Sequence, residues 1–184
     1  MLRVGILTIH NSPNYGASLQ SYALYKYISQ QSGIECEIID LHRPHEDGYV
    51  KSKKFVPYRG KPFSIKRLIK STLQKILRHE SKNVTYYSID SKCKFDEFNK
   101  GLNLSRPYWG IDELYATPPC YDIYMTGSDQ VWNPTQPYCL EPYFLTFVPK
   151  GKKKISYASS IGVTELLENE KQDFRRWLSS YDAI

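Results

Sequence analysis

Residues 2–41 of this 184-residue chain read LRVGILTIHNSPNYGASLQSYALYKYISQQSGIECEIIDL, and this stretch decides the fold class. Apolar runs at residues 2–9 and 34–41 predict two buried strands, and the stretch between them predicts a helix over residues 17–31. A strand, a crossover helix and a second strand in this order nearly always form a right-handed unit with parallel strands. We therefore expect an α/β fold, a Rossmann-like parallel sheet with flanking helices.

The first expected helix carries two apolar rows. Leu19, Ala23 and Tyr27 form one row with i, i+4 spacing, and Leu24 and Ile28 form a second. We expect these rows together to form the stripe that covers the sheet.

Alternating strands and helices continue along the chain. Strands are predicted at residues 121–126 and 154–159, with a weaker one at residues 143–148. A helix is expected over residues 164–181. Its buried side would be formed by Leu167, Phe174, Trp177, Leu178 and Tyr181.

Residues 121–134, YDIYMTGSDQVWNP, place a dense polar and aromatic cluster directly after a strand. Gly127 permits a sharp turn or a close backbone approach there. A hydroxyl, a carboxylate, two amides and an indole follow within six positions, from Ser128, Asp129, Gln130, Asn133 and Trp132. The indole can cover a sugar face while the polar groups pair with hydroxyls. From spacing alone, a hydrogen-bonded turn whose Trp132 fills the core is an equal alternative.

Four segments resemble the polysaccharide pyruvyl transferase family. Residues 127–134, GSDQVWNP, are similar to the family's signature, and residues 14–17, NYGA, with the helix that follows, resemble its opening loop and helix. Residues 95–105, FDEFNKGLNLS, and 154–162, KISYASSIG, also resemble family segments in the expected order. The resemblance covers nearly the whole chain except a basic stretch at about 45–91.

The resemblance implies transfer of a pyruvyl group from phosphoenolpyruvate, a donor substrate, to two sugar hydroxyls, which yields a cyclic ketal and phosphate without a cofactor. The acceptor would be a sugar or a lipid-linked or nucleotide-linked saccharide in exopolysaccharide or cell-surface glycan biosynthesis. Asp129 would bind the acceptor or act as a base. The implied substrate-binding residues are Asn14, Tyr15, Gly16, Gln20, Gly127, Ser128, Gln130, Trp132 and Asn133.

Family members resemble two-domain enzymes of the glycosyltransferase-B type. In them, the segment that matches residues 181–184 continues into a second domain, so we expect this chain to be the N-terminal domain, with the C-terminal domain missing. The alternative is a non-catalytic carbohydrate-binding or partner-binding α/β domain left by truncation. Half of a nucleotide-sugar glycosyltransferase is a third, weaker hypothesis.

Three loops are expected beyond the carboxyl ends of the strands, where open parallel sheets bind ligands: residues 10–16, 127–133 and 159–163. The first has neither the GxGxxG nor the GxxxxGK[ST] pattern, so dinucleotide and phosphate-loop binding are not indicated. Gly16 still begins a helix whose free N–H groups can hold an anion. The alternative is a plain turn before a helix capped by Ser18.

His10 and His42 follow predicted strands and are candidate acids or bases. Neither has an identifiable partner in the sequence, and such a histidine is more often structural. Asp40 ends the second strand, where Rossmann proteins bind a ribose.

Because the three loops hold no cation other than His10, we expect the cations that bind the donor to come from another domain.

The net charge of +6 comes from one segment. Residues 51–100 hold 14 of the 25 lysines and arginines but only four of the 19 acidic residues. Residues 64–79 predict an amphipathic helix, within a basic helical insertion at about 45–91 of a single domain spanning 1–184. A solvated helix face is the expected role, and peripheral membrane-surface contact through residues 51–82 is the alternative. No nucleic-acid-binding motif accompanies the charge, so no nucleic acid partner is expected.

The N-terminal apolar run is too short for a signal peptide, and no later window has the length of a membrane span. A cytoplasmic protein is therefore expected. The four cysteines have no metal-ligand spacing, so the sequence predicts no metal site.

Overall fold

The computed structural model describes residues 1–12, 14–44, 46–59 and 89–184. In chain order, the elements are β1 (Leu2–Leu7), α1 (Tyr15–Ser29), β2 (Ile34–Ile38), α3 (Ile89–Asn99), α4 (Ile111–Ala116), β3 (Ile123–Asp129), the 3₁₀ helix η1 (Glu141–Phe144), β4 (Lys153–Ser159) and α5 (Glu168–Leu178). The helix expected over residues 64–79 lies outside the described residues, as does most of the basic insertion.

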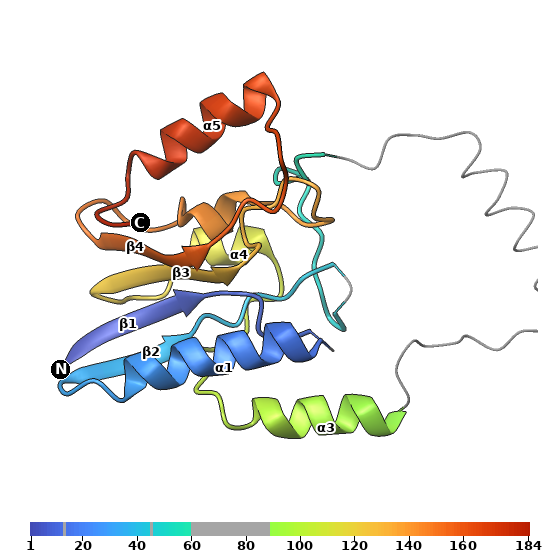
Figure 1. The fold of residues 1–184 in the computed structure, drawn as a ribbon, viewed down its shortest axis with the longest axis vertical. Coiled ribbons are helices and arrows are strands. Elements are labelled where there is room, and N and C mark those ends of the chain that lie inside the picture. The colour runs from blue at the N-terminus through green and yellow to red at the C-terminus, as the bar shows by residue number, and fades with distance from the viewer. Residues whose placement is uncertain (13, 45, 60–88) are drawn as a thin grey trace, which may run out of the picture.

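The four strands form one parallel sheet in the order β2-β1-β3-β4. Val4 of β1 is in register with Cys36 of β2 and with Ile123 of β3, and Met125 of β3 is in register with Ile155 of β4. The α/β, Rossmann-like fold with flanking helices is therefore confirmed (Figure 1).

Alternation along the strands creates an apolar layer on each face of the sheet. Val4, Ile6 and Met125 point to one face and pack with Leu24 of α1. Leu7 and Tyr124 point to the other face, where α4, η1 and α5 cover them. Burial on both faces is typical of a parallel sheet.

The buried face of α1 differs from the expected stripe. Leu19 and Tyr27 are 58% and 63% exposed, while Ser18 and Ser21 are buried beside Leu24. The Ser18 hydroxyl donates to the Ser12 carbonyl oxygen, and the Ser21 hydroxyl donates to the Ser18 carbonyl oxygen. Both buried hydroxyls therefore have a hydrogen-bond partner. Only the row containing Leu24 was predicted correctly.

The strand predicted at residues 143–148 is wrong, because η1 and turns occupy this region. Tyr143, Phe144 and Leu145 are consecutive and all at most 1% exposed, a pattern that fits a core-filling turn as well as a buried strand. Leu145 ends η1 with a positive φ of 54°.

The last helix is shorter than expected. Leu167 precedes α5 as its N-cap and is 56% exposed, contrary to prediction. Phe174 and Trp177 are buried as predicted, and Leu178 and Tyr181 pack against the same core. Beyond α5, Ala183 forms a parallel bridge with Ile155, so this segment pairs along the free edge of β4.

None of the helices in the described part of the chain combines the length and apolar character needed to cross a membrane.

Candidate functional site

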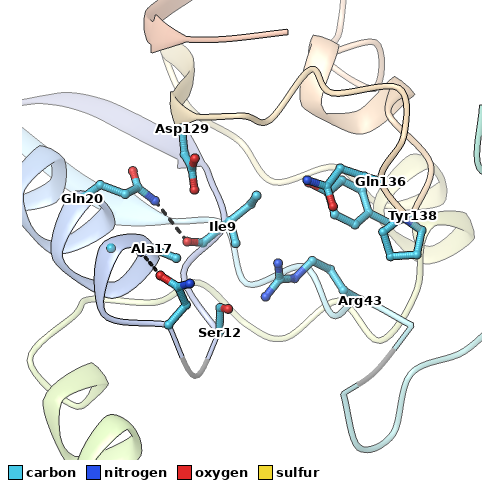
Figure 2. Close-up of a pocket in the computed structure, with 11 residues that line it drawn as sticks. Ile9, Ser12, Ala17, Gln20, Arg43, Asp129, Gln136 and Tyr138 are labelled. Carbon is cyan, nitrogen blue, oxygen red and sulfur yellow. Dashed lines mark hydrogen bonds between the residues drawn. The ribbon is translucent and has the colours of Figure 1, made fainter. Parts of the chain in front are cut away.

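A cavity of about 520 Å³ lies at the carboxyl ends of β1 and β3 (Figure 2). At this point the strand order reverses, because β2 and β3 pair with opposite edges of β1. Open parallel sheets bind ligands at such a switch point. The walls come from the segment after β1, the start of α1, Arg43, Asp129 and residues 136–138.

The start of α1 forms one wall and is organised by Asn14. This residue is extended, with a φ of −131°, and its side-chain oxygen accepts a hydrogen bond from the N–H of Ala17 at 3.1 Å. Asn14 is therefore the N-cap, and not Ser18 as the alternative interpretation of this loop had it. Gly16 and Ala17 follow on the cavity wall.

Tyr15 does not join the other predicted site residues. Its side chain is 74% exposed and its ring lies 4.8 Å from the ring of Phe95 on α3. It lines a separate, mostly apolar groove with Leu19 and Phe98. The Tyr15 side chain therefore makes no contact with the cavity.

Gln20 connects three elements at the cavity. Its Nε2 donates to Thr8 Oγ1 and to the Ile9 carbonyl oxygen, both at 3.1 Å, after β1. Its Oε1 accepts a hydrogen bond of 2.6 Å from Ser128 Oγ on β3. Gln20 and Ser128 thus fix α1 against the ends of β1 and β3, which holds the cavity walls in place.

The end of β3 directs Asp129 into the cavity. Gly127 has a φ of +122°, and a Cβ added there would lie 2.0 Å from the Tyr157 carbonyl oxygen of β4, so only glycine fits. The Gly127–Ser128 peptide bond is cis. Asp129 also has a positive φ, 83°, which is uncommon for a residue other than glycine. Its Oδ1 accepts from the N–H of Gln130 at 2.7 Å.

Trp132 fills the core and does not face the cavity. It is 4% exposed, its ring is stacked on Phe144 with centroids 5.1 Å apart, and its Nε1 donates to the Tyr143 carbonyl oxygen at 2.9 Å. The structure therefore corresponds to the core-filling alternative, and the indole offers no face to a sugar.

Gln130 and Asn133 brace the loop after β3. Asn133 is 6% exposed, donates to Gln130 Oε1 at 2.9 Å and accepts from the N–H of Thr135 at 3.0 Å. Both side chains touch Gly162, where an added Cβ would lie 2.6 Å from Gln130 Oε1. Their amide groups form hydrogen bonds within the loop, and neither residue lines the cavity.

The third expected loop, residues 159–163, lies behind the cavity wall. Ser160 donates its N–H to the Asp129 carbonyl oxygen at 2.9 Å and accepts from the N–H of Trp132 at 3.2 Å. This loop therefore supports Asp129 and does not line the cavity.

Arg43 brings a cation into the cavity from a segment that sequence reasoning did not include. It is 6% exposed, its Nε donates to Glu46 Oε1 at 2.9 Å, and its Nη2 donates to the Asn11 carbonyl oxygen. The available signal was position, because Arg43 closely follows a strand whose carboxyl end lies on the ligand side. The expectation that the cations come from another domain missed this residue.

Residues 136–138 form the remaining wall and were also missed. Gln136 and Tyr138 lie across Ile9 from Gln20 and Asp129 (Figure 2). No local motif marks this segment, since its place depends on the long connection from β3 to η1.

His10 and His42 have partners that the sequence did not reveal. His10 Nε2 lies 3.0 Å from Asp40 Oδ1, and His42 Nε2 lies 3.9 Å from Asp40 Oδ2. Glu46 continues the network, because its carboxylate lies 3.6 Å from His42 Nδ1 and accepts from Asn11 Nδ2 at 2.9 Å. His10 is 3% exposed. Its contact with Asp40 and the bond from Asn11 to Glu46 join the segments after β1 and β2, and Glu46 in turn holds Arg43.

Within the described ranges, no group of His, Cys, Asp and Glu side chains has the arrangement of a metal site.

A family model described as polysaccharide pyruvyl transferase matches residues 14–184. The match begins at the Asn14 cap and includes β3, Asp129 and α5. No curated protein and no solved structure matches this chain.

Proposed function

Because the chain belongs to the polysaccharide pyruvyl transferase family, we propose that it transfers a pyruvyl group from phosphoenolpyruvate to a saccharide acceptor, with Asp129 as the acceptor-side base. The acceptor would belong to exopolysaccharide or cell-surface glycan biosynthesis.

One observation carries this proposal. The Asp129 carboxylate lies at the cavity, and the surrounding fold holds the backbone of this residue in an uncommon conformation. Asp129 has a φ of 83°, and its carbonyl oxygen is held by the N–H of Ser160 at 2.9 Å. Residues in uncommon backbone conformations persist where surrounding structure holds them, often at functional sites. The cavity of about 520 Å³ has the size of small-ligand pockets.

The proposed chemistry balances as follows. The methylene carbon of phosphoenolpyruvate gains a proton, and a sugar hydroxyl oxygen bonds to the neighbouring carbon while losing its own proton. A second hydroxyl oxygen then bonds to the same carbon and displaces phosphate, and the proton of that hydroxyl leaves with the phosphate, which closes the cyclic ketal. Asp129 would accept the proton of an attacking hydroxyl, the role of a general base. Gln20 and Ser128 would keep α1 and β3 at a fixed separation around the acceptor.

The test uses Asp129→Asn, which keeps the side-chain shape and is tolerated at positive φ but cannot accept the proton. We expect the host glycan to lose at least about 99% of its pyruvate ketal, since general bases contribute about 10²-fold or more. Ketal is measured by its methyl signal in proton NMR of the purified glycan. Asp96→Asn, on an exposed part of α3, is the matched control and should keep the ketal content of the wild type.

Unchanged ketal content in a folded Asp129→Asn protein would remove Asp129 from the reaction. Glycan binding without ketal formation by the wild-type protein would instead favour a non-catalytic carbohydrate-binding domain. A new glycosidic bond in place of a ketal would identify a glycosyltransferase.

A further inference from the structure

The cavity separates its two charged groups between two walls. Asp129 and Gln20 reach it from β3 and α1, and Arg43 and Tyr138 lie across Ile9 from them (Figure 2). An anionic ligand is therefore favoured in the part of the cavity that lies away from the Asp129 carboxylate.

Arg43 keeps donor capacity at this wall. Glu46 and the Asn11 carbonyl oxygen occupy its Nε and Nη2, while Nη1 makes no hydrogen bond to any described residue. A guanidinium held by two partners is preorganised and loses little freedom when it binds an oxyanion.

Tyr138 provides an unused hydroxyl at the same wall. The residue is 5% exposed and its hydroxyl has no hydrogen-bond partner in the described part of the chain. Tyr138 lines the cavity together with Arg43 and Asp129. Burial raises the pKa of Tyr138, so the hydroxyl stays protonated and can donate. A buried hydroxyl without a partner costs free energy, which a ligand atom would recover.

The start of α1 supplies a third group of donors. The N–H groups of Tyr15 and Gly16 precede the first hydrogen bonds of this 15-residue helix, and its first turn contains no acidic residue. Its positive end therefore meets the cavity at Gly16 without a compensating carboxylate.

We propose that Arg43, the Tyr138 hydroxyl and the first turn of α1 form a subsite for the phosphate group of a phosphorylated ligand. This inference rests on the proposed function only for the identity of that ligand. The phosphate would be that of the phosphoenolpyruvate donor or part of the diphosphate of a nucleotide-linked or lipid-linked acceptor.

The first measurement is calorimetric titration of the purified protein with inorganic phosphate, which requires no acceptor and no turnover. Tyr138→Phe should weaken phosphate binding about tenfold or more, as expected for a lost hydrogen bond to a charged group. It should not lower the melting temperature, because the hydroxyl has no hydrogen-bond partner to lose among the described residues. Arg43→Lys should also weaken binding, since an ammonium cannot reproduce the planar fork.

Tyr115→Phe is the matched control. Its hydroxyl is hydrogen-bonded to Thr146 away from the cavity, so this change should lower stability and leave phosphate affinity unchanged. Equal phosphate affinity in the wild type and Tyr138→Phe, or no phosphate binding by the wild type, would overturn the subsite.

Competition identifies the ligand. Displacement of phosphate by phosphoenolpyruvate but not by uridine diphosphate would assign the subsite to the donor, and the reverse would assign it to the carrier of the acceptor. Phosphate binding that depends on Tyr138, in a protein that forms no ketal, would leave the subsite standing and refute the proposed function. Ketal formation by the wild type, with the same phosphate affinity in Tyr138→Phe as in the wild type, would support the proposed function and refute the subsite.

Discussion

At the scale of single residues, hydrogen bonding decides the role of Trp132. Its indole N–H donates to the Tyr143 carbonyl oxygen at 2.9 Å, and the Tyr181 hydroxyl donates to the same oxygen at the longer distance of 3.4 Å. Its ring is stacked on Phe144 in the centre of the core. Both ends of the side chain are thus used within the protein.

Trp132→Phe should therefore destabilise the protein by about 1–3 kcal/mol, because the Tyr143 carbonyl loses its shorter hydrogen bond inside the core. Urea unfolding followed by fluorescence measures the change. Trp109→Phe, at a position 42% exposed, is the control and should change stability by less than about 0.5 kcal/mol. If Trp132→Phe instead preserved stability and weakened saccharide binding, the indole would be a ligand platform.

Sequence reasoning found the polar cluster after β3 but could not assign its directions. Ser128 and Asp129 face the α1 side and the cavity, whereas Trp132 turns into the core. These directions depend on the positive φ values at Gly127 and Asp129, which no periodicity rule describes. Arg43 and Tyr138 were missed because folding brings them to the cavity from distant parts of the sequence.

At the scale of elements, the pairing of β3 with β4 requires close backbone approach at one position. Gly127 is in register with Tyr157, and an added Cβ would meet the Tyr157 carbonyl at 2.0 Å. This contact lies immediately before Ser128 and Asp129, so the pairing of the strands and the direction of Asp129 depend on the same glycine.

Gly127→Ala should cost about 3 kcal/mol or more, because an unfavourable φ and a backbone overlap act together. Gly151→Ala is a matched control: Gly151 has a φ of +83° but no atom within 4 Å of an added Cβ, so only the conformational cost of about 1 kcal/mol applies. The free energies of unfolding come from urea titrations. Equal losses for the two variants would show that β4 moves away to accommodate the methyl group.

The elements themselves were predictable where burial follows a simple period. All four strands and both α1 and α5 were located from apolar runs and stripes, with errors at their ends. Prediction failed for η1, where three consecutive side chains are buried, and for the α1 face, where Ser18 and Ser21 are buried. In both cases tertiary packing overrides the local pattern.

At the scale of the whole molecule, a distant segment is joined to α5 by an ion pair between the half-buried Arg59 and the buried carboxylate of Glu170. Arg59 Nε and Nη2 each lie 2.6 Å from one carboxylate oxygen of Glu170, which is 0% exposed. Glu170 also accepts from the N–H of Leu167 at 2.8 Å, at the start of α5. The same carboxylate therefore fixes the end of the segment 46–59 and begins the helix that covers the sheet.

This arrangement makes a pH-dependent contribution to stability. The hydrogen bonds from Arg59, and next the one from Leu167, lower the pKa of Glu170 from its ordinary value of 4.5 in spite of burial. Because the folded protein holds this proton less tightly than the unfolded chain, the contribution is fully present above about pH 4.5 and is lost as the pH falls through the lower, folded value.

Glu170→Gln should therefore lower the melting temperature at pH 7, since Arg59 loses its charged partner, and the gap between wild type and variant should narrow as the pH decreases from 5 to 3. Circular dichroism melting curves at several pH values measure the difference in melting temperature between the wild type and the variant. Glu168→Gln, which removes an exposed carboxylate paired with Lys171, should have little effect at any pH. A gap of the same size at pH 3 and pH 7 would mean that the shape of Glu170, and not its charge, holds the segment against α5.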